Sequence, residues 1–173
     1  LLSAVEGWDQ NRYGVTLQDD EILSLAGSQE GFAHVALTLC DPGDVVLVPN
    51  PGYPVFEAGP FLNDAKIAYY ELDKTNHYAP ALDKIPEELA KKAKMMVVSY
   101  PLNPTCTCIE KADYEKIIAF AKKYNIAIIH DNAYSEIEYD GRTGFSFLSV
   151  PGAKEVGIEF NSLSKTYNLT GIR

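Results

Sequence analysis

Cysteine is scarce in this sequence, which contains three cysteines among 173 residues. Cys106 and Cys108 form a Cys-Thr-Cys pair, but no second pair of Cys or His residues stands at the spacing of a zinc site. The number of cysteines is also odd. We therefore expect no metal site, and we interpret Cys40, Cys106 and Cys108 as buried or half-buried thiols in a reducing compartment.

Long apolar runs and dense basic runs are also missing. No stretch approaches the roughly 20 apolar residues that cross a bilayer, and the N-terminus has no basic region followed by a long apolar one. The formal net charge is -9, so the summed field of the protein repels phosphate backbones. We expect a cytoplasmic protein that binds neither membrane nor nucleic acid, although a chain that starts in the middle of a pattern could have lost a leader.

Apolar residues are plentiful, at 46% of the chain, while charged residues make up 23% and aromatic residues 11%. These values are typical of a folded protein of about one domain. No internal repeat, low-complexity tract or linker divides the chain, so we expect one domain over residues 1–173. Residues 171–173 resemble a strand that is just starting, so we also expect a fragment of a larger protein.

Short β-branched and apolar runs alternate with helical patterns along the chain. This alternation is typical of a parallel sheet with helices on both faces. The sequence therefore predicts an α/β fold of three layers, α/β/α, around a mostly parallel sheet. The expected strands cover residues 22–25, 45–48, 67–70, 95–99, 126–129 and 156–160, and the expected helices cover 29–39 with Ser28 as N-cap, 55–61, a short segment near 86–93, and 111–124.

Polar residues follow most of the predicted strands directly. Ligands of open parallel sheets bind beyond the carboxyl ends of the strands, so these residues are candidates for a binding site. Each also has a simpler interpretation, such as a turn, a helix cap, a loop, a rim tyrosine or a solvated lysine. The candidates are Ser28, Gln29, Tyr53, Asn103, Asp131, Tyr134, Ser162 and Lys165.

Asp131 is the strongest single candidate, because a carboxylate at the end of an apolar strand is costly unless a cation or a donor pairs with it. A cap or a structural ion pair remains the alternative. His130 lies inside the strand pattern, and we interpret it as a hydrogen-bonded core residue rather than an acid–base group.

The joint order of several motifs resembles one family. The chain carries PNPGYP at 49–54, YPLNPT at 100–105, DNAY at 131–134 and SLSKTYNLTGIR at 162–173, which look like the successive motifs of class I/II, fold-type I aminotransferases. The segment at 12–31, RYGVTLQDDEILSLAGSQEG, is similar to the branch of LL-diaminopimelate and related aspartate-type aminotransferases. The resemblance implies the cofactor-binding large domain, without the N-terminal arm and the C-terminal small domain. Leu102 and Cys106 depart from the family pattern in the loop that carries Asn103.

The resemblance implies pyridoxal 5′-phosphate as the cofactor. It makes Lys165 the residue that forms a Schiff base with the cofactor and moves the substrate proton. It also makes Asp131 the partner of the ring nitrogen. Asn103 and Tyr134 would hydrogen-bond the 3′-oxygen of the ring, and Tyr53 would stack on its face.

The same resemblance implies that the phosphate sits at the start of the 29–39 helix. Ser28 and Gln29 would offer backbone N–H groups there. Ser162 and Arg173 would add side-chain donors.

The implied activity is transfer of an amino group from an amino acid to a 2-oxo acid by a homodimer. Three alternatives stay open: a C–S lyase of the same fold that performs β-elimination, a cofactor-sensing domain of a transcription regulator, and a non-catalytic remnant. The family's substrate-binding arginine falls beyond position 173, and its cross-dimer tyrosine falls before position 1. We therefore expect this fragment alone to bind the cofactor weakly and to transaminate slowly or not at all.

Overall fold

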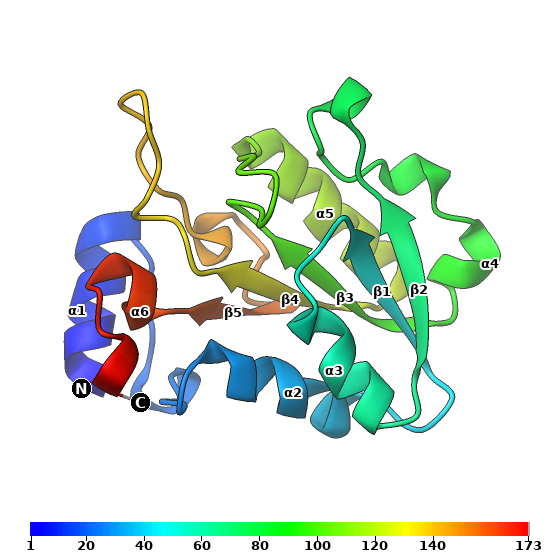
Figure 1. Cartoon of the computed structure of the whole chain (residues 1–173), viewed down its shortest axis with the longest axis horizontal. Coiled ribbons are helices and arrows are strands. Elements are labelled where there is room, and N and C mark those ends of the chain that lie inside the picture. The colour runs from blue at the N-terminus through cyan, green and yellow to red at the C-terminus, as the bar shows by residue number, and fades with distance from the viewer. Residues whose placement is uncertain (173) are drawn as a thin grey trace.

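The computed structural model describes residues 1–172. One sheet of five parallel strands runs through the molecule in the order β2-β1-β3-β4-β5 (Figure 1). The strands are β1 Val45–Asn50, β2 Lys66–Glu71, β3 Ala93–Ser99, β4 Ala127–Asn132 and β5 Gly157–Asn161, and the helices are α1 Leu2–Tyr13, α2 Ser28–Leu39, α3 Val55–Leu62, α4 Glu87–Ala90, α5 Lys111–Tyr124 and α6 Leu163–Thr166. The predicted α/β class with a mostly parallel sheet is confirmed.

Two apolar clusters lie on opposite faces of the sheet, because successive side chains of a strand point in opposite directions. Val46 and Val48 of β1 belong to the cluster under α2 and α3, whereas Val45 and Leu47 belong to the cluster under α5. Helices therefore cover both faces (Figure 1). Burial on both faces explains why β1 and β3 read as continuous apolar runs.

Helix α5 has the bounds that the sequence predicted. It begins with a capping box between Glu110 and Asp113, and it ends where Asn125 adopts a left-handed conformation with φ 56°. One face of the helix is buried against the sheet and the opposite face carries lysines. The buried residues are Tyr114, Ile117, Ile118 and Ala121.

The structure corrects three of the expected elements. Residues 22–25 do not join the sheet, and Leu23 is 81% exposed; strand propensity makes a strand only where a neighbouring strand is available for pairing. Ser28 is the first residue of α2 rather than its N-cap, which is Gly27 at φ 92°. The helix expected near 86–93 covers only Glu87–Ala90, because β3 begins at Ala93.

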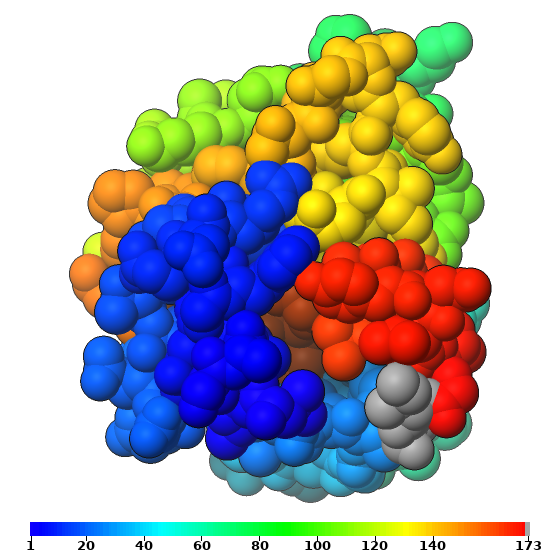
Figure 2. Space-filling view, turned by 90° about the vertical axis from the view of Figure 1, so that its left-hand side faces the viewer, coloured from blue at the N-terminus to red at the C-terminus, as the bar shows by residue number. Residues whose placement is uncertain are grey.

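The two ends of the chain meet on one side of the molecule. Figure 2 shows the N-terminal segment, in blue, beside the C-terminal segment, in red, and Trp8 of α1 meets the Tyr167 ring edge-on with centroids 5.7 Å apart. The strand start expected at 171–173 is a 3-10 turn over Thr170–Ile172, and Arg173 lies outside the described residues. Within residues 1–172, no helix is both long and apolar enough to cross a bilayer.

All three cysteines are free thiols. Cys40 is buried and Cys108 is half-buried, as expected, but Cys106 is exposed in the loop after β3, where its φ is 59°. Burial raises the pKa of Cys40, and burial together with the Glu138 carboxylate raises the pKa of Cys108 to about 11. Both thiols therefore stay protonated at neutral pH. In the described part of the chain, no group of three or more His, Cys, Asp or Glu side chains is placed to hold a metal ion.

Candidate functional site

The sheet topology creates a site at one edge. All five strands are parallel, so their carboxyl ends lie along the same edge of the sheet. The chain runs outward from β1 to β2 and then returns to form β3 on the other side of β1, so the topology switches between β1 and β3. Ligands of such sheets bind outside the strand ends at the switch point. The loops after β1 and β3 carry Tyr53 and Asn103, and the neighbouring strand β4 carries Asp131 as its last residue but one.

Asp131 has a buried carboxyl group near the end of β4, and the residue is only 8% exposed. Its Oδ2 accepts a hydrogen bond from Ser99 Oγ of β3, at 3.4 Å. Burial raises the pKa of Asp131 to about 6, although His130, Ser99, Lys165 and the Ala133 N–H each oppose the rise. The ionised carboxylate is therefore poorly compensated by the described residues, and a bound cation would stabilise it.

Lys165 comes from α6, the short helix directly after β5. Its side chain is exposed, and its amine makes no ion pair among residues 1–172. Its charge nevertheless lowers the pKa of Asp131, so the two groups lie within electrostatic reach of each other. The structure thus brings together the predicted amine and the predicted carboxylate at one edge of the sheet.

Tyr134 and Asn103 lie beside this pair. Burial raises the pKa of Tyr134, as do the neighbouring Asp131 carboxylate and Tyr53 phenol, whereas a hydrogen bond with the Asn103 side chain lowers it. The phenol therefore stays protonated at neutral pH and can donate a hydrogen bond. The neighbours that act on the pKa of Tyr134 thus include three further predicted site residues, Tyr53 after β1, Asn103 after β3 and Asp131 in β4.

Tyr53 connects this position to the start of α2. Gln29 Nε2 donates a hydrogen bond to the Tyr53 hydroxyl at 2.9 Å, and the Tyr53 ring meets Phe56 edge-on with centroids 6.1 Å apart. None of the hydrogen bonds among the described residues uses the backbone N–H groups of Ser28 or Gln29. These two groups are free donors at a helix N-terminus, where an anion is favoured.

Ser162 is the remaining predicted donor within the described residues. It is the N-cap of α6, and its hydroxyl makes no capping hydrogen bond. The predicted contribution of Arg173 lies outside the described part of the chain.

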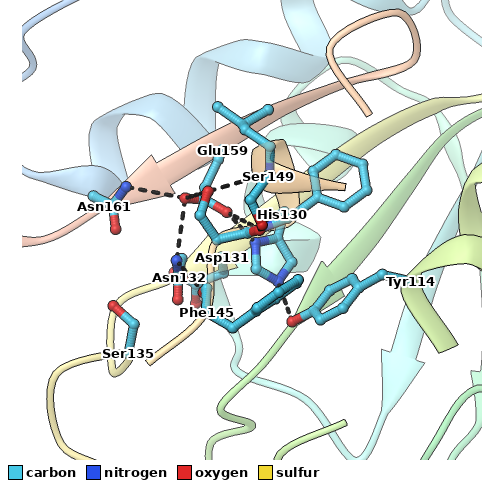
Figure 3. Close-up of polar contacts among 12 residues, drawn as sticks. Tyr114, His130, Asp131, Asn132, Ser135, Phe145, Ser149, Glu159 and Asn161 are labelled. Carbon is cyan, nitrogen blue, oxygen red and sulfur yellow. Dashed lines mark hydrogen bonds and ion pairs between the residues drawn. The ribbon is translucent and has the colours of Figure 1, made fainter. Parts of the chain in front are cut away.

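A buried polar network behind Asp131 was only partly foreseen. His130 is fully buried; its ring nitrogens contact Glu159 Oε2 at 2.9 Å and the Tyr114 hydroxyl at 3.1 Å (Figure 3). The interpretation of His130 as a hydrogen-bonded core residue is therefore confirmed. The sequence does not predict a role for Glu159, whose one signal is a carboxylate within the apolar run of β5.

The N-terminal helix also supports the site, which the sequence did not indicate. Arg12 of α1 forms an ion pair with Glu136 at 3.0 Å. The Tyr13 hydroxyl contacts Ser135 Oγ at 3.0 Å and Glu136 Oε1 at 2.9 Å. These contacts hold the loop after β4, which carries Tyr134, against α1.

Comparison with known proteins identifies relatives over the full length of the chain. A model of the family described as aminotransferase class I and II matches residues 3–173. The chain is 47% identical to the LL-diaminopimelate aminotransferase of Moorella thermoacetica over 98% of this chain, and 48% identical to that of Halothermothrix orenii over 98%. In both cases the match covers 44% of the relative, so the chain spans less than half the length of these enzymes.

Solved structures show the same arrangement. A substrate-bound structure of BacF from Bacillus subtilis matches 99% of this chain with a TM-score of 0.95 and 39% identity. A probable N-succinyldiaminopimelate aminotransferase from Thermus thermophilus matches 99% with a TM-score of 0.93 and 36% identity. This chain covers 44% and 46% of these two structures.

Proposed function

Because the chain belongs to the class I and II aminotransferase family, whose cofactor is pyridoxal 5′-phosphate, we propose that the protein containing it transfers an amino group between an amino acid and a 2-oxo acid. In this proposal residues 1–173 form part of the cofactor-binding large domain. The observation that carries it is the buried carboxyl of Asp131, whose pKa burial raises to about 6 and whose ionised form the nearby Lys165 favours. A cationic ring nitrogen is the kind of partner that stabilises such a carboxylate.

The groups at the strand ends fit the polar parts of this cofactor. Pyridoxal phosphate combines a ring nitrogen, a ring oxygen and a phosphate, and when bound it supplies an electron-withdrawing ring for the charge that develops at the substrate Cα. The site offers a carboxyl at Asp131, a phenol and an amide at Tyr134 and Asn103, and free N–H groups at Ser28 and Gln29. Each polar part thus has a matching group.

Asp131 is proposed to accept a hydrogen bond from the protonated ring nitrogen. This pairing offsets the cost of burying the carboxylate and lowers its pKa again. Ser99 Oγ and the Ala133 N–H orient the carboxylate from the other side. A fixed negative charge at this atom keeps the nitrogen protonated and therefore favours electron withdrawal by the ring.

Lys165 is proposed to hold the cofactor and to carry the substrate proton on Nζ. A lysine acts as a base when it is removed from water, because desolvation favours the neutral amine. The position of α6 directly after β5 supports this role, and so does the effect of the Lys165 charge on the pKa of Asp131 near the end of β4.

Tyr134 and Asn103 are proposed to hydrogen-bond the ring oxygen, and Tyr53 is proposed to pack on the ring. The interaction between Tyr134 and Asn103 and the anchoring of Tyr53 by Gln29 support these positions. Both contacts limit the rotamers of side chains that would otherwise be mobile at the rim of the site.

The phosphate is proposed to bind at the start of α2. The free N–H groups of Ser28 and Gln29 and the uncommitted hydroxyl of Ser162 support this position. Arg173 belongs to the same proposal through the sequence motif alone.

We also propose that the intact protein is a cytoplasmic homodimer without nucleic-acid or membrane partners. The net charge of -9 supports the absence of nucleic acid. The names of the LL-diaminopimelate aminotransferase relatives support an acidic or diamino-dicarboxylic substrate. The dimer rests on the family resemblance.

The proposal is tested by the absorbance spectrum of the full-length protein with pyridoxal phosphate, before and after Lys165→Ala. We expect a long-wavelength band that shifts or disappears in the variant, because the band arises from the bond between cofactor and lysine. Lys92→Ala, at another exposed lysine, is the control and should keep the wild-type spectrum. A Lys165→Ala spectrum identical to that of the wild type would refute the assignment.

Substrate turnover then separates the transferase from the lyase. An aminotransferase needs a 2-oxo acid to complete its cycle, so product formation should stop when the oxo acid is withheld. Release of ammonia and pyruvate from an amino acid alone would instead identify a lyase.

A further inference from the structure

The side chain of Glu159 is almost completely buried although β5 lies at the edge of the described sheet. It is 1% exposed, whereas its neighbour Ile158 is exposed. A carboxylate in such a position destabilises the fold unless donors surround it. The partners of Glu159 therefore indicate what the residue is for.

Five donors converge on this carboxylate (Figure 3). Burial by itself would raise the pKa of Glu159, but hydrogen bonds from these donors and the proximity of His130 lower it below its usual value. Glu159 is therefore an ionised acceptor at neutral pH. Oε2 accepts from His130 Nδ1 at 2.9 Å and the Phe147 N–H at 2.8 Å, and Oε1 accepts from Ser146 Oγ at 2.9 Å, Asn132 Nδ2 at 3.1 Å and Asn161 Nδ2 at 3.2 Å.

Two of the donors, His130 and Asn132, flank Asp131 in β4. Because side chains alternate along a strand, both point to the face opposite Asp131. A carboxylate only accepts, so His130 Nδ1 carries the hydrogen and Nε2 is left to face the Tyr114 hydroxyl. Burial raises the pKa of Tyr114 well above its usual value, so this hydroxyl keeps its proton and can donate it. The histidine ring is thus fixed at both nitrogens.

Asn132 is held in the same way. It donates to Glu159 Oε1 and to the Phe145 carbonyl at 3.0 Å. Its own Oδ1 is buried without a partner among the described residues. Within residues 1–172, the Asn132 side chain is thus held only by the hydrogen bonds that its amide group donates. Burial of its oxygen without a partner costs free energy.

Asp131 itself has few restraints on its side chain. Among the described residues, its carboxylate meets one side-chain donor, Ser99 Oγ at 3.4 Å, and one backbone donor, the Ala133 N–H of the same segment. The position of its carboxylate therefore depends on the backbone of residues 130–132, which is fixed by the hydrogen bonds from His130 and Asn132 to Glu159. We propose that Glu159 is a positioning residue: by holding His130 and Asn132 it sets the place of the Asp131 carboxylate toward the cofactor ring.

This inference rests on the proposed function, and Glu159 does not touch the cofactor in it. Glu159 faces α5, because it pairs with His130 in the sheet register and His130 packs against Tyr114. The next residue, Phe160, packs against Phe32 of α2 on the other face. Glu159 therefore acts on the site through β4.

The first test is Glu159→Gln in the full-length protein, with Glu155→Gln as control. Glutamine keeps the size but replaces one oxygen by a donor, so at least two of the five donors face another donor. Glu155 is exposed and pairs only with Lys122 among the described residues. We expect Glu159→Gln to weaken pyridoxal phosphate binding about tenfold or more and to shift the pH midpoint of the cofactor absorbance. Glu155→Gln should change neither quantity.

A second pair of variants tests whether the hydrogen bonds to Glu159 position Asp131 or only stabilise the buried Glu159 carboxylate. Asn132→Ala and Ser146→Ala each remove a hydrogen bond to the same atom, Oε1, but only Asn132 belongs to β4. Both variants should lower the thermal unfolding midpoint. Asn132→Ala should also weaken cofactor binding at least about fivefold, whereas Ser146→Ala should stay within about twofold of the wild type.

The outcomes are distinct. Equal cofactor affinity and equal pH midpoints in Asn132→Ala, Ser146→Ala and the wild type overturn the positioning role, whether or not Glu159→Gln folds. A wild-type protein without a cofactor band overturns the proposed function and, with it, the inference. A wild-type band with loss of affinity in Glu159→Gln and Asn132→Ala alone supports both.

Discussion

At the scale of single residues, the site contains two buried carboxylates that differ in how completely hydrogen-bond donors compensate their charges. Among the described residues, the buried Asp131 carboxylate meets only the Ser99 hydroxyl, at 3.4 Å, and the Ala133 N–H. Glu159, one register position away on the neighbouring strand β5, instead accepts from five donors. Burial raises the pKa of Asp131, and hydrogen bonding lowers that of Glu159. The same residue chemistry is therefore proposed to bind the cofactor at Asp131 and to support the site at Glu159.

The raised pKa of Asp131 predicts a pH-dependent cost in the cofactor-free protein. Its pKa is about 6 in the folded chain against 3.8 for an ordinary aspartate, so the fold loses up to about 3 kcal/mol of stability as the pH rises from about 4 to above about 6. Asp131→Asn removes this cost. We expect the variant to exceed the wild type in free energy of unfolding at about pH 8 and to lose that advantage near pH 4.

Denaturant unfolding of both proteins at the two pH values checks this prediction, with the exposed Asp83→Asn as control. The advantage of Asp131→Asn should grow with pH, while that of Asp83→Asn should not. A pH-independent difference would mean that Asp131 is not buried as a costly carboxylate. With pyridoxal phosphate present the order should reverse, because the variant has no charge to pair with the ring nitrogen.

At the scale of elements, close packing of α2 against α3 depends on a glycine. A Cβ added to Gly59 of α3 would lie 2.4 Å from the Phe32 carbonyl oxygen and 3.0 Å from the Ala33 carbonyl oxygen in α2. Both atoms belong to helix backbone, which cannot give way without moving the helix. The position of α2 matters for the site because its first turn carries Ser28 and Gln29.

Gly59→Ala should therefore destabilise the protein by about 1–3 kcal/mol through overpacking. Gly7→Ala is the matched control, since nothing lies within 4 Å of a Cβ at that position in α1. It should stabilise the protein by about 0.5–1 kcal/mol, because alanine favours the helix interior. Urea unfolding measures both, and changes of the same sign would contradict the packing argument.

Several elements could be predicted from the sequence because their signals are local. The amphipathic pattern of α5 with its polar ends fixes both of its bounds, and the apolar run of β3 indicates a central strand. Helix α1 has almost no apolar face and buries only Asp9, so periodicity does not detect it. Residues 22–25 read as a strand, but pairing depends on neighbours that the local sequence does not specify.

The residues of the candidate site also differ in whether the sequence predicts them. The strand-end residues could be named in advance, because a parallel sheet collects the ends of its strands at one edge. Glu159 could not, because its donors come from residues 130, 132, 146, 147 and 161 and meet only in the folded chain. The roles of the strand-end residues remain predictions.

At the scale of the whole molecule, the first helix and the site are joined by contacts between distant parts of the chain. Tyr13 and Ser135 are 122 residues apart, and their hydroxyls are within 3.0 Å. With Arg12 and Glu136, they restrain the loop that carries Tyr134. Long-range contacts of this kind stabilise a loop that has little regular structure of its own.

Removing the Tyr13 hydroxyl should loosen this loop. Tyr13→Phe should lower the free energy of unfolding by about 1 kcal/mol, the size of a typical hydrogen bond. It should also speed amide hydrogen exchange over residues 133–138 while leaving α5 unchanged. Tyr139→Phe, at an exposed tyrosine, is the control. Equal exchange in the two variants would show that α1 does not restrain the loop.

The proposal that Lys165 holds the cofactor is tested most directly by identifying the lysine to which the cofactor is bound. Full-length protein incubated with pyridoxal phosphate and reduced with borohydride keeps the cofactor covalently on the lysine that bound it, and peptide mass spectrometry locates the label. We expect one labelled peptide, the one that contains Lys165. A label on any other lysine, or no label at all, would contradict the proposed role of Lys165.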